Sequence, residues 1–448
     1  MSLAKRGSGA GRGSIGPLYQ RLPHGPHSLE QREVVRHQRV RMHGAMIEAV
    51  AANGYERTSV KQVVSLAGVS RRSFYEQFAN KQECFLATFD LLATRGAKRI
   101  SAAYRATEGP MEERLKGAFR ELADAVGTNW KGAGLVILEA PKTGAPWLLR
   151  IRQATATFEQ MLSSSFESDL EASALPRPVV RGIAGGLHGA LSMCLREGSA
   201  EDLPALTEEM HRWTLLFQTP AAERMAERVR RRMRAGLNGP IGRNGHGSGG
   251  AGARSPDERE RLLHSVLALA TVEDYRELSA PQIADAADVP VDAFREFFED
   301  KNECFLAAFE MLADELLGLA ADPDLVSSDW PGAVRRVIGE LMRHLAEHPI
   351  HARTIATVSL AAGPEAIERN LELSYSVASL LTEGAPEQAR SELALEGVVG
   401  AIFHTIRCHV AGGQIQLLPA LSDYLAYVVL TPFIGADAAA AYLADEQP

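Results

Sequence analysis

Residues 59–81, S-V-K-Q-V-V-S-L-A-G-V-S-R-R-S-F-Y-E-Q-F-A-N-K, constrain the fold of this chain more strongly than any other stretch. They predict two short helices joined by a tight turn. Ser59 and Gln62 have the spacing of a capping box, which begins the first helix. Gly68 supplies the turn, where a Cβ would be crowded, and Ser70 caps the second helix.

The second helix of this pair has an apolar inner side and a polar outer side. Phe74 and Phe78 are expected to point inward. The outer side carries guanidinium, hydroxyl and phenol groups, which suit base edges and phosphates in a major groove. These outward residues are Arg71, Arg72, Ser73 and Tyr75.

A further capping box, Asn80-x-x-Glu83, begins the next helix and places Lys81 at its N-terminus. An ammonium group and free backbone N–H groups at such a position can bind a phosphate. The alternative interpretation of the whole stretch is an ordinary helical hairpin with a solvated basic face.

Residues 39–92 resemble the DNA-binding domain of the TetR family of bacterial transcriptional repressors. The resemblance rests on three segments within this range, G-Y-E-R-T-S-V, A-G-V-S-R-R-S-F-Y and F-A-N-K-Q-E-C-F. It implies a helix-turn-helix domain that binds double-stranded DNA. The predicted DNA-binding residues are Thr58, Ser59, Ser70, Arg71, Arg72, Ser73, Tyr75, Lys81, Arg39 and Arg41.

The residues before this motif are also basic. Residues 30–53 are expected to form the first helix, with Gly54 just past its end, and arginines near its start can reach phosphates. Residues 1–29 form an arm rich in Gly, Ser and Arg, in which three prolines prevent a regular helix. Two interpretations of the arm stay open, a disordered tail and a segment that follows the DNA backbone or enters a minor groove.

The sequence of the first half recurs in the second half. F-E-D-K-N-E-C-F-L-A-A-F-E-M-L-A at 298–313 matches F-A-N-K-Q-E-C-F-L-A-T-F-D-L-L-A at 78–93. Further matches pair Tyr55 with Tyr275, residues 129–133 with 329–333, and residues 203–206 with 418–421. Repeats of this length are duplicated domains. We therefore predict an all-α fold of two tandem TetR-like units, each with a helix-turn-helix domain and a helical ligand-binding and dimerisation domain.

A chain of 448 residues is too long for one ordinary core, so several domains are expected. The predicted domains are a basic arm (1–29), a helix-turn-helix domain (30–95, motif about 59–80), a helical regulatory and dimerisation domain (96–234), a Gly-rich linker (235–254), a degenerate helix-turn-helix domain (255–315) and a second helical regulatory and dimerisation domain (316–448). The linker is dominated by Gly, Asn and Ser and cannot bury a core.

The two helix-turn-helix domains differ in surface chemistry. Residues 35–90 contain eight Lys or Arg and five Asp or Glu, whereas residues 255–310 contain five and fourteen. An acidic surface is repelled by a polyanion. The outward positions of the second domain hold Pro290, Val291, Asp292, Ala293 and Arg295. We expect the second domain to keep the fold without reading DNA.

These features predict a transcriptional repressor that a small, mostly apolar molecule releases from a DNA operator by favouring the non-binding state. The second unit is expected to serve as an intramolecular pseudo-dimer partner. Pairing of two chains into a homodimer stays open, as does masking of the basic helix at 224–234 by the acidic second domain. A helical interaction module that does not bind DNA is the alternative.

Neither an enzyme nor a metalloprotein is predicted. The sequence has no nucleophile elbow, phosphate-binding Gly loop, metal-ligand spacing or clustered carboxylate pair, so no cofactor or metal is expected. Candidate ligand-pocket residues are Trp130, Trp147, His188, Trp330 and His404, with core packing as the alternative. Four glycines at 182–189 permit close helix packing, either across an interface or within one unit.

The cysteines and the hydropathy pattern indicate the compartment. Four cysteines without a C-x-x-C pair fit reduced thiols. The equivalent positions of Cys84 and Cys304 favour a role in the core, and Cys408-His409 is expected to be core packing. No apolar run is expected to reach the roughly 18 residues of a membrane span, and the N-terminus lacks the apolar segment of a signal peptide. The prediction is a cytoplasmic protein without membrane contact.

Overall fold

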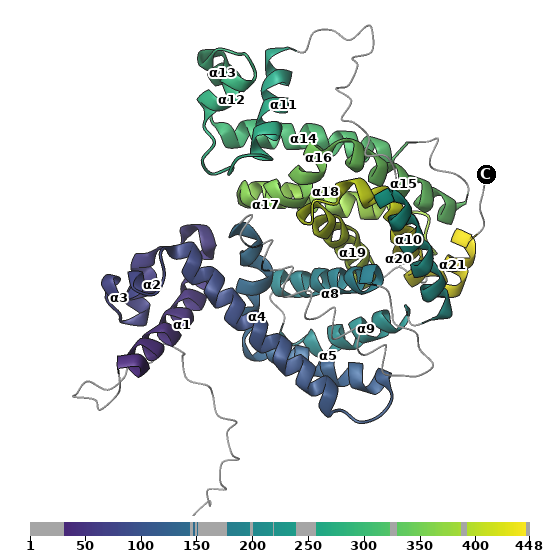
Figure 1. Cartoon of the computed structure of the whole chain (residues 1–448), viewed down its shortest axis with the longest axis horizontal. Helices are drawn as coiled ribbons and strands as arrows, with labels where there is room; N and C mark the ends of the chain where they lie inside the picture. Colours follow the sequence, from purple (N-terminus) through teal and green to yellow (C-terminus); the bar gives the residue numbers. More distant parts are fainter. Residues whose placement is uncertain are drawn as a thin grey trace, which may run out of the picture. The chain divides into compact units, whose positions relative to one another are not determined.

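The computed structural model describes residues 31–143, 147, 150, 177–197, 200–217, 219–238, 257–322, 329–386 and 392–444. Its regular elements are helices, and no strand occurs in these ranges (Figure 1). The predicted all-α fold class is confirmed. The basic arm and most of the Gly-rich linker lie outside the described residues.

The helices of the first half are α1 (Gln31–Arg57), α2 (Val60–Ala67), α3 (Arg71–Tyr75), α4 (Lys81–Ala106), α5 (Met111–Thr128), α6 (Trp130–Gly134), the π-helix η1 (Leu135–Glu139), the 3-10 helix η2 (Ala140–Thr143), α8 (Arg177–Glu197), α9 (Leu203–Leu215) and α10 (Pro220–Asn238). Those of the second half are α11 (Glu258–Ala270), α12 (Ala280–Ala286), α13 (Val291–Phe297), α14 (Lys301–Ala320), α15 (Trp330–Glu347), α16 (Pro349–Arg353), the π-helix η3 (Thr354–Val358), α17 (Ser359–Ala361), α18 (Pro364–Thr382), α19 (Glu392–Ala411), the 3-10 helix η5 (Ile415–Leu421), α20 (Ser422–Ile434) and α21 (Ala436–Ala444).

The two halves have similar orders of elements. The helix α12 follows α11 as α2 follows α1, and both α2 and α12 are short helices with a capping box. The helices α5 and α15 are each followed by a short helix and a π-helix. Trp130 begins α6, whereas Trp330 begins α15. The sequence match of 129–133 with 329–333 therefore does not join equivalent positions, and that part of the repeat prediction was wrong.

The chain divides into two compact units, one made of residues 1–93 with 131–140 and the other of residues 94–130 with 141–448. In the first unit, α1 bends at Gly54, where φ is 74° and the backbone is not helical. The N–H of Tyr55, which follows the bend, donates to Oε2 of Glu139 at 2.7 Å. Lys131 forms an ion pair with Glu48 of α1. These contacts join residues 131–140 to the helix-turn-helix domain.

In the second unit, α8 and α19 pack together more extensively than any other pair of the described helices (Figure 1). A Cβ built on Gly185 would lie 2.5 Å from the carbonyl oxygen of Gly400, and one on Gly189 would lie 2.9 Å from that of Glu396. Both distances are too short for a real side chain, so glycine is required at each position. The glycines of α8 thus permit close packing between the first and second halves of one chain.

The basic helix α10 packs against elements of the second half through two of its arginines. Its Arg232 forms an ion pair of 2.6 Å with Asp423 of α20, a carboxylate that also pairs with Arg335 of α15 at 3.0 Å. Arg228 donates to carbonyl oxygens at the end of α21. These partners lie on α15, α20 and α21 and not on α11–α14, where masking by the acidic segment was expected.

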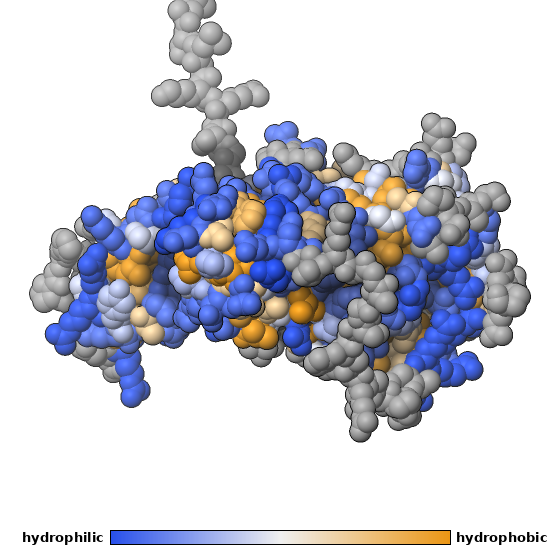
Figure 2. Space-filling view, turned by 90° about the horizontal axis from the view of Figure 1, so that it is seen from above, coloured by the Kyte–Doolittle hydropathy of each residue, from blue (hydrophilic) through white to orange (hydrophobic). Residues whose placement is uncertain are grey.

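The residues Ile415–Ile434 form the one stretch among those described that is long and apolar enough to cross a membrane, and 78% of it is buried inside the protein. Figure 2 shows a face that is mostly hydrophilic, with separate hydrophobic patches. The expectation that no apolar run reaches this length was wrong, because a buried core helix acquires the same composition as a membrane span.

Cys84 and Cys304 are both fully buried, as expected of core residues. Burial raises the pKa of each thiol to about 12, so both stay protonated at neutral pH. A protonated, inaccessible thiol is a poor nucleophile, which agrees with a packing role.

We predict that Gly185→Ala destabilises the second unit by about 1–3 kcal/mol, because the added methyl group meets a backbone oxygen that cannot move away. The matched control is Gly339→Ala in α15, where no atom lies within 4 Å of the added Cβ. That substitution is expected to leave stability unchanged or to raise it by about 0.5–1 kcal/mol. Thermal and urea denaturation measure both. Equal effects of the two substitutions would show that the glycine contact is not tight.

Candidate nucleic-acid interface

The turn between α2 and α3 has the geometry that its sequence predicts. Ser59 Oγ accepts from the N–H of Gln62 at 3.3 Å, and Gln62 Oε1 accepts from the N–H of Ser59 at 2.8 Å. Gly68 adopts φ 60°, the left-handed conformation that ends α2. Ser70 Oγ accepts from the N–H of Ser73 at 3.0 Å and so begins α3. The predicted caps are present.

The inner side of α3 fixes the direction of its outer side. Phe74 and Phe78 are 0% and 1% exposed, and their rings lie 5.6 Å apart. With these rings in the core, Arg71, Arg72 and Tyr75 are exposed to solvent. Three side chains with donor groups therefore stand on one turn of helix, as a base-reading surface requires.

Two of these outward side chains have partners within the domain. Arg72 forms an exposed ion pair with Glu76, in which Nε and Oε1 are 2.9 Å apart. The ring of Tyr75 lies edge-on to that of Phe74, with centroids 5.4 Å apart, and the residue remains 56% exposed. The pair engages Nε of Arg72 at an exposed position, where such ion pairs are weak.

Two predicted DNA-binding residues are not on the surface. Thr58 is 3% exposed, and its hydroxyl donates to the carbonyl oxygen of Gly54 at 2.7 Å. Arg41 is 9% exposed within α1. Arg39 is exposed, and its guanidinium lies 5.0 Å from the centre of the Phe78 ring. We therefore keep Arg39 as a candidate and withdraw Thr58 and Arg41.

Lys81 has a role in the fold that its sequence position did not predict. Its Nζ donates to the carbonyl oxygens of Tyr55 at 3.0 Å and Glu56 at 3.2 Å. It also lies 4.2 Å from the centre of the Tyr55 ring. The ammonium group thus satisfies the last carbonyls of α1, a favourable place for a cation.

The elements α11–α14 of the second half contain the same arrangement around Lys301. Its Nζ donates to the carbonyl oxygens of Tyr275 at 2.8 Å, Arg276 at 3.0 Å and Leu278 at 2.8 Å. The fold thus explains both lysines without a phosphate contact. These bonds give Lys81 a structural role, and its phosphate contact stays a prediction.

The core of the second domain resembles that of the first, and its outer face differs. Phe294 and Phe298 are 0% and 4% exposed, close to the values for Phe74 and Phe78 in the first domain. On the outside, Arg295 pairs with Asp292 at 3.2 Å, and the aspartate side chain is 94% exposed. The outer face therefore presents a carboxylate where the first domain presents arginine.

The candidate pocket residues do not form one cluster. Trp147 is 1% exposed, with the Arg407 guanidinium 5.7 Å from its ring centre. Burial, together with the charge of Arg407, lowers the pKa of His188 to about 4. Trp147, His188 and Arg407 therefore lie in one region of the second compact unit. His404 contacts Cys408, with Nε2 and Sγ 3.4 Å apart.

The two remaining candidates lie elsewhere. Trp330 donates to the carbonyl oxygen of Leu381 at 2.9 Å and packs edge-on to Phe433, which is core packing. Trp130 begins α6 and is half-buried.

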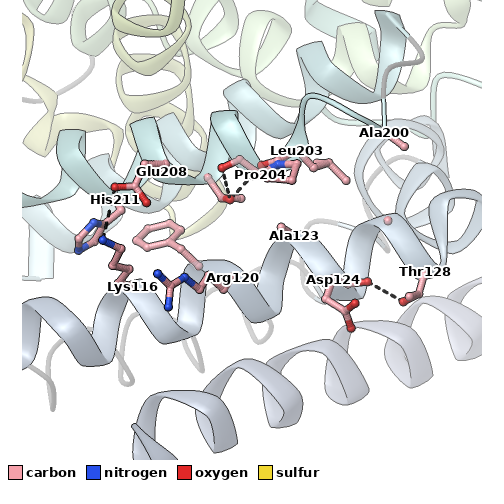
Figure 3. Close-up of a pocket in the computed structure, with 13 residues that line it drawn as sticks. Lys116, Arg120, Ala123, Asp124, Thr128, Ala200, Leu203, Pro204, Glu208 and His211 are labelled. Atoms are coloured by element: carbon pink, nitrogen blue, oxygen red, sulfur yellow. Dashed lines mark hydrogen bonds and ion pairs between the residues drawn. The ribbon is translucent and has the colours of Figure 1, made fainter. Parts of the chain in front are cut away.

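A separate cavity of about 560 Å³ lies between α5 and α9 (Figure 3), within the size range of ligand sites. Lys116 and Glu208 face each other across it, with 3.8 Å between Nζ and Oε1, and Phe119 forms part of its apolar wall. None of the five predicted pocket residues lines this cavity. Its charged rim suits a polar or amphipathic molecule better than a wholly apolar one.

Residues 45–88 match the family model described as "Bacterial regulatory proteins, tetR family". This segment is a TetR-type helix-turn-helix domain. The HTH-type transcriptional regulator TcmR of Streptomyces glaucescens is 26% identical over 175 residues, which cover 37% of this chain and 75% of TcmR. These matches identify a DNA-binding transcriptional regulator, and the all-α TetR-like fold agrees with them.

Two solved structures also align with part of the chain. The fatty acid degradation regulator FadR from Bacillus halodurans is 20% identical, with a TM-score of 0.35, and the alignment covers 39% of this chain and 96% of that FadR chain. FadR from Bacillus subtilis, solved in complex with stearoyl-CoA, is 17% identical, with a TM-score of 0.36, and the corresponding shares are 39% and 95%.

We predict that Lys81→Ala lowers the stability of the first unit by about 1–3 kcal/mol, the range for hydrogen bonds from a charged group. Affinity for nonspecific duplex DNA is expected to keep its salt dependence, measured from about 50 to 200 mM salt. Loss of a phosphate contact would instead lower the slope by about one. The control is Lys61→Ala, an exposed lysine on α2, which is expected to leave stability unchanged.

Proposed function

We propose that this regulator is a repressor in which the first helix-turn-helix domain reads the operator and the second half of the chain serves as its partner. The exposed row of Arg71, Arg72 and Tyr75 on α3 carries this proposal. Arginine is the residue that most often contacts guanine in the major groove. Arg39 on α1 adds a candidate phosphate contact.

Two observations support a pseudo-dimer within one chain. The order of helices in the first half recurs in the second, from the helix-turn-helix elements to the π-helix after α5 and α15. In addition, α8 and α19, which occupy similar places in the two orders, pack against each other through Gly185 and Gly400. A contact between equivalent helices is what a two-fold dimer interface would provide between separate chains.

The second helix-turn-helix domain is proposed to be silent towards DNA. Its window at 255–310 has a net charge of −9, against +3 for the window at 35–90. Such a surface has few cations to neutralise DNA phosphates, so few counterions are released and the electrostatic contribution to DNA affinity is small. Lys301, the cation that it shares with the first domain, is engaged with backbone carbonyls.

The proposed effector is a small, mostly apolar molecule bound in the helical region. The buried ring of Trp147 supports an apolar wall for such a site, and the Arg407 guanidinium, 5.7 Å from the ring centre, adds a charge beside it. The charged cavity between α5 and α9 is the second candidate, and its lining favours an amphipathic molecule. In either site, release of DNA requires that the effector prefer the non-binding arrangement of the protein.

Selection of bound sequences from a random DNA pool with the full-length, ligand-free protein tests the proposal. We expect an enriched motif. A palindrome would mean that two basic domains act together and therefore that two chains pair, and a single half-site would mean that one chain is the binding unit. A folded protein that enriches nothing would overturn the proposal in favour of an interaction module.

On the selected sequence, Arg71→Ala and Arg72→Ala are each expected to cost about 1–3 kcal/mol and to relax specificity at the contacted base. The matched control is Arg295→Ala on α13, the arginine that occupies the position of Tyr75 in the repeat. It is expected to leave DNA affinity unchanged. Fluorescence anisotropy measures all three, and a loss with Arg295→Ala as large as the other two would show that the second domain reads DNA.

Glu76→Gln is expected to strengthen DNA binding by up to about tenfold, because it frees Arg72 and removes a negative charge near the phosphates. The same anisotropy titration measures this effect. Weaker binding would mean that the Glu76 carboxylate orients Arg72 for its contact.

A further inference from the structure

Three histidine rings meet at the corner between α15 and α16, in the sequence H-L-A-E-H-P-I-H at 344–351. One nitrogen from each of His344, His348 and His351 lies within 4.8 Å of those of the other two. His344 and His348 are stacked, with centroids 4.3 Å apart, and Nε2 of His344 lies 3.1 Å from Nδ1 of His351. The cluster shares no residue with the DNA-binding face of α3 or with the cavity between α5 and α9.

The distances suit a single metal ion. Two nitrogens that bind one Zn²⁺ at about 2.0–2.1 Å in a tetrahedral site lie about 3.3 Å apart. The 3.1 Å separation of His344 Nε2 and His351 Nδ1 is close to this value. A ligand nitrogen of the exposed His348 lies within 4.8 Å of those of the other two rings.

His348 is already oriented as metal-binding histidines usually are. Its Nδ1 donates to the carbonyl oxygen of His344 at 3.0 Å. A hydrogen bond from one ring nitrogen to a backbone carbonyl fixes the tautomer and leaves the lone pair on the other nitrogen. Nε2 of His348 is therefore the atom available to an ion.

A fourth ligand comes from a different helix. The Glu315 carboxylate on α14 places Oε1 3.6 Å from His344 Nε2 and Oε2 3.8 Å from His351 Nδ1. Neutral imidazole and ionised carboxylate are the forms that bind metals.

The cluster is not needed for the helical corner itself. When α15 is aligned with α5 from their first residues, the three histidines fall on Ala125, Asn129 and Gly132. A similar sequence of helices therefore forms in the first half without any imidazole at these places. Three histidines and a carboxylate around one point are better explained by a ligand than by packing.

We propose that His344, His348, His351 and Glu315 form a binding site for one divalent transition-metal ion, for which Zn²⁺ is the best fit. The set of three nitrogens and one oxygen is the kind that tetrahedral Zn²⁺ accepts. Because α14 also contains Lys301 of the second helix-turn-helix domain, an ion here ties that helix to the α15–α16 corner. The second half would then bind a metal ion at a site separate from the candidate effector sites.

The test uses the full-length chain without a histidine tag, stripped of metal with EDTA. Co²⁺ serves as the spectroscopic probe, since tetrahedral Co²⁺ absorbs strongly in the visible range. We expect one Co²⁺ per chain, displacement of its absorption by Zn²⁺, and a higher thermal midpoint with either ion, because a ligand that binds only the folded state stabilises it.

His348→Ala and Glu315→Gln each remove one ligand at an exposed position, so the fold is expected to stay intact. Each is expected to weaken Zn²⁺ binding more than about tenfold, since even outer-shell partners of a ligand contribute roughly 10–100-fold. The control is His37→Ala, an exposed histidine on α1, which is expected to bind as the wild type does. Absence of the tetrahedral absorption, or wild-type affinity in both ligand variants, would overturn the proposal and leave a hydrogen-bonded histidine cluster.

Discussion

The close approach of α8 and α19 is the contact on which the second compact unit depends. Gly185 and Gly400 bring two backbones together with no room for a Cβ, and this fixes helices from opposite halves of the sequence against each other. The pair of Arg232 with the buried Asp423 adds a second connection between the halves. Both connections are intramolecular, so they form to the same extent at any protein concentration.

If the second half serves as the partner of the first, as proposed, this arrangement allows the two DNA-binding-type segments to differ. In a dimer of identical chains, every substitution on a DNA-binding face appears twice, whereas in one chain each domain has its own sequence. The second domain keeps the buried Phe294 and the carbonyl-capping Lys301, which the fold requires, and has an acidic outer face. The retained residues therefore serve the fold, and the changed residues are those on which the proposal of a DNA-silent second segment rests.

The sequence predicted well those features that depend on neighbours within one turn of helix. The caps at Ser59 and Ser70, the turn at Gly68 and the buried Phe74 all follow from local hydrogen bonds and periodicity.

Features set by distant partners were missed, because no local pattern records them. Lys81 bonds to a carbonyl 26 residues away. The ion pair of Arg232 with Asp423 was missed for the same reason, because the two residues lie in different helices. The same holds for the histidine cluster, whose carboxylate partner Glu315 lies on another helix. The spacing H-x3-H-x2-H is present in the sequence, but it becomes a metal-binding pattern only when the corner at Pro349 and the carboxylate of α14 are known.

The hydrogen bond from the Tyr55 N–H to Glu139 sets a lower limit on how strongly an effector must act through the π-helix η1. Moving η1 away breaks this partly buried hydrogen bond to a carboxylate, which costs about 1–3 kcal/mol. Each 1.4 kcal/mol corresponds to about tenfold in affinity. A molecule that signals by displacing this segment must therefore bind the displaced form roughly 5- to 150-fold more tightly than the docked form.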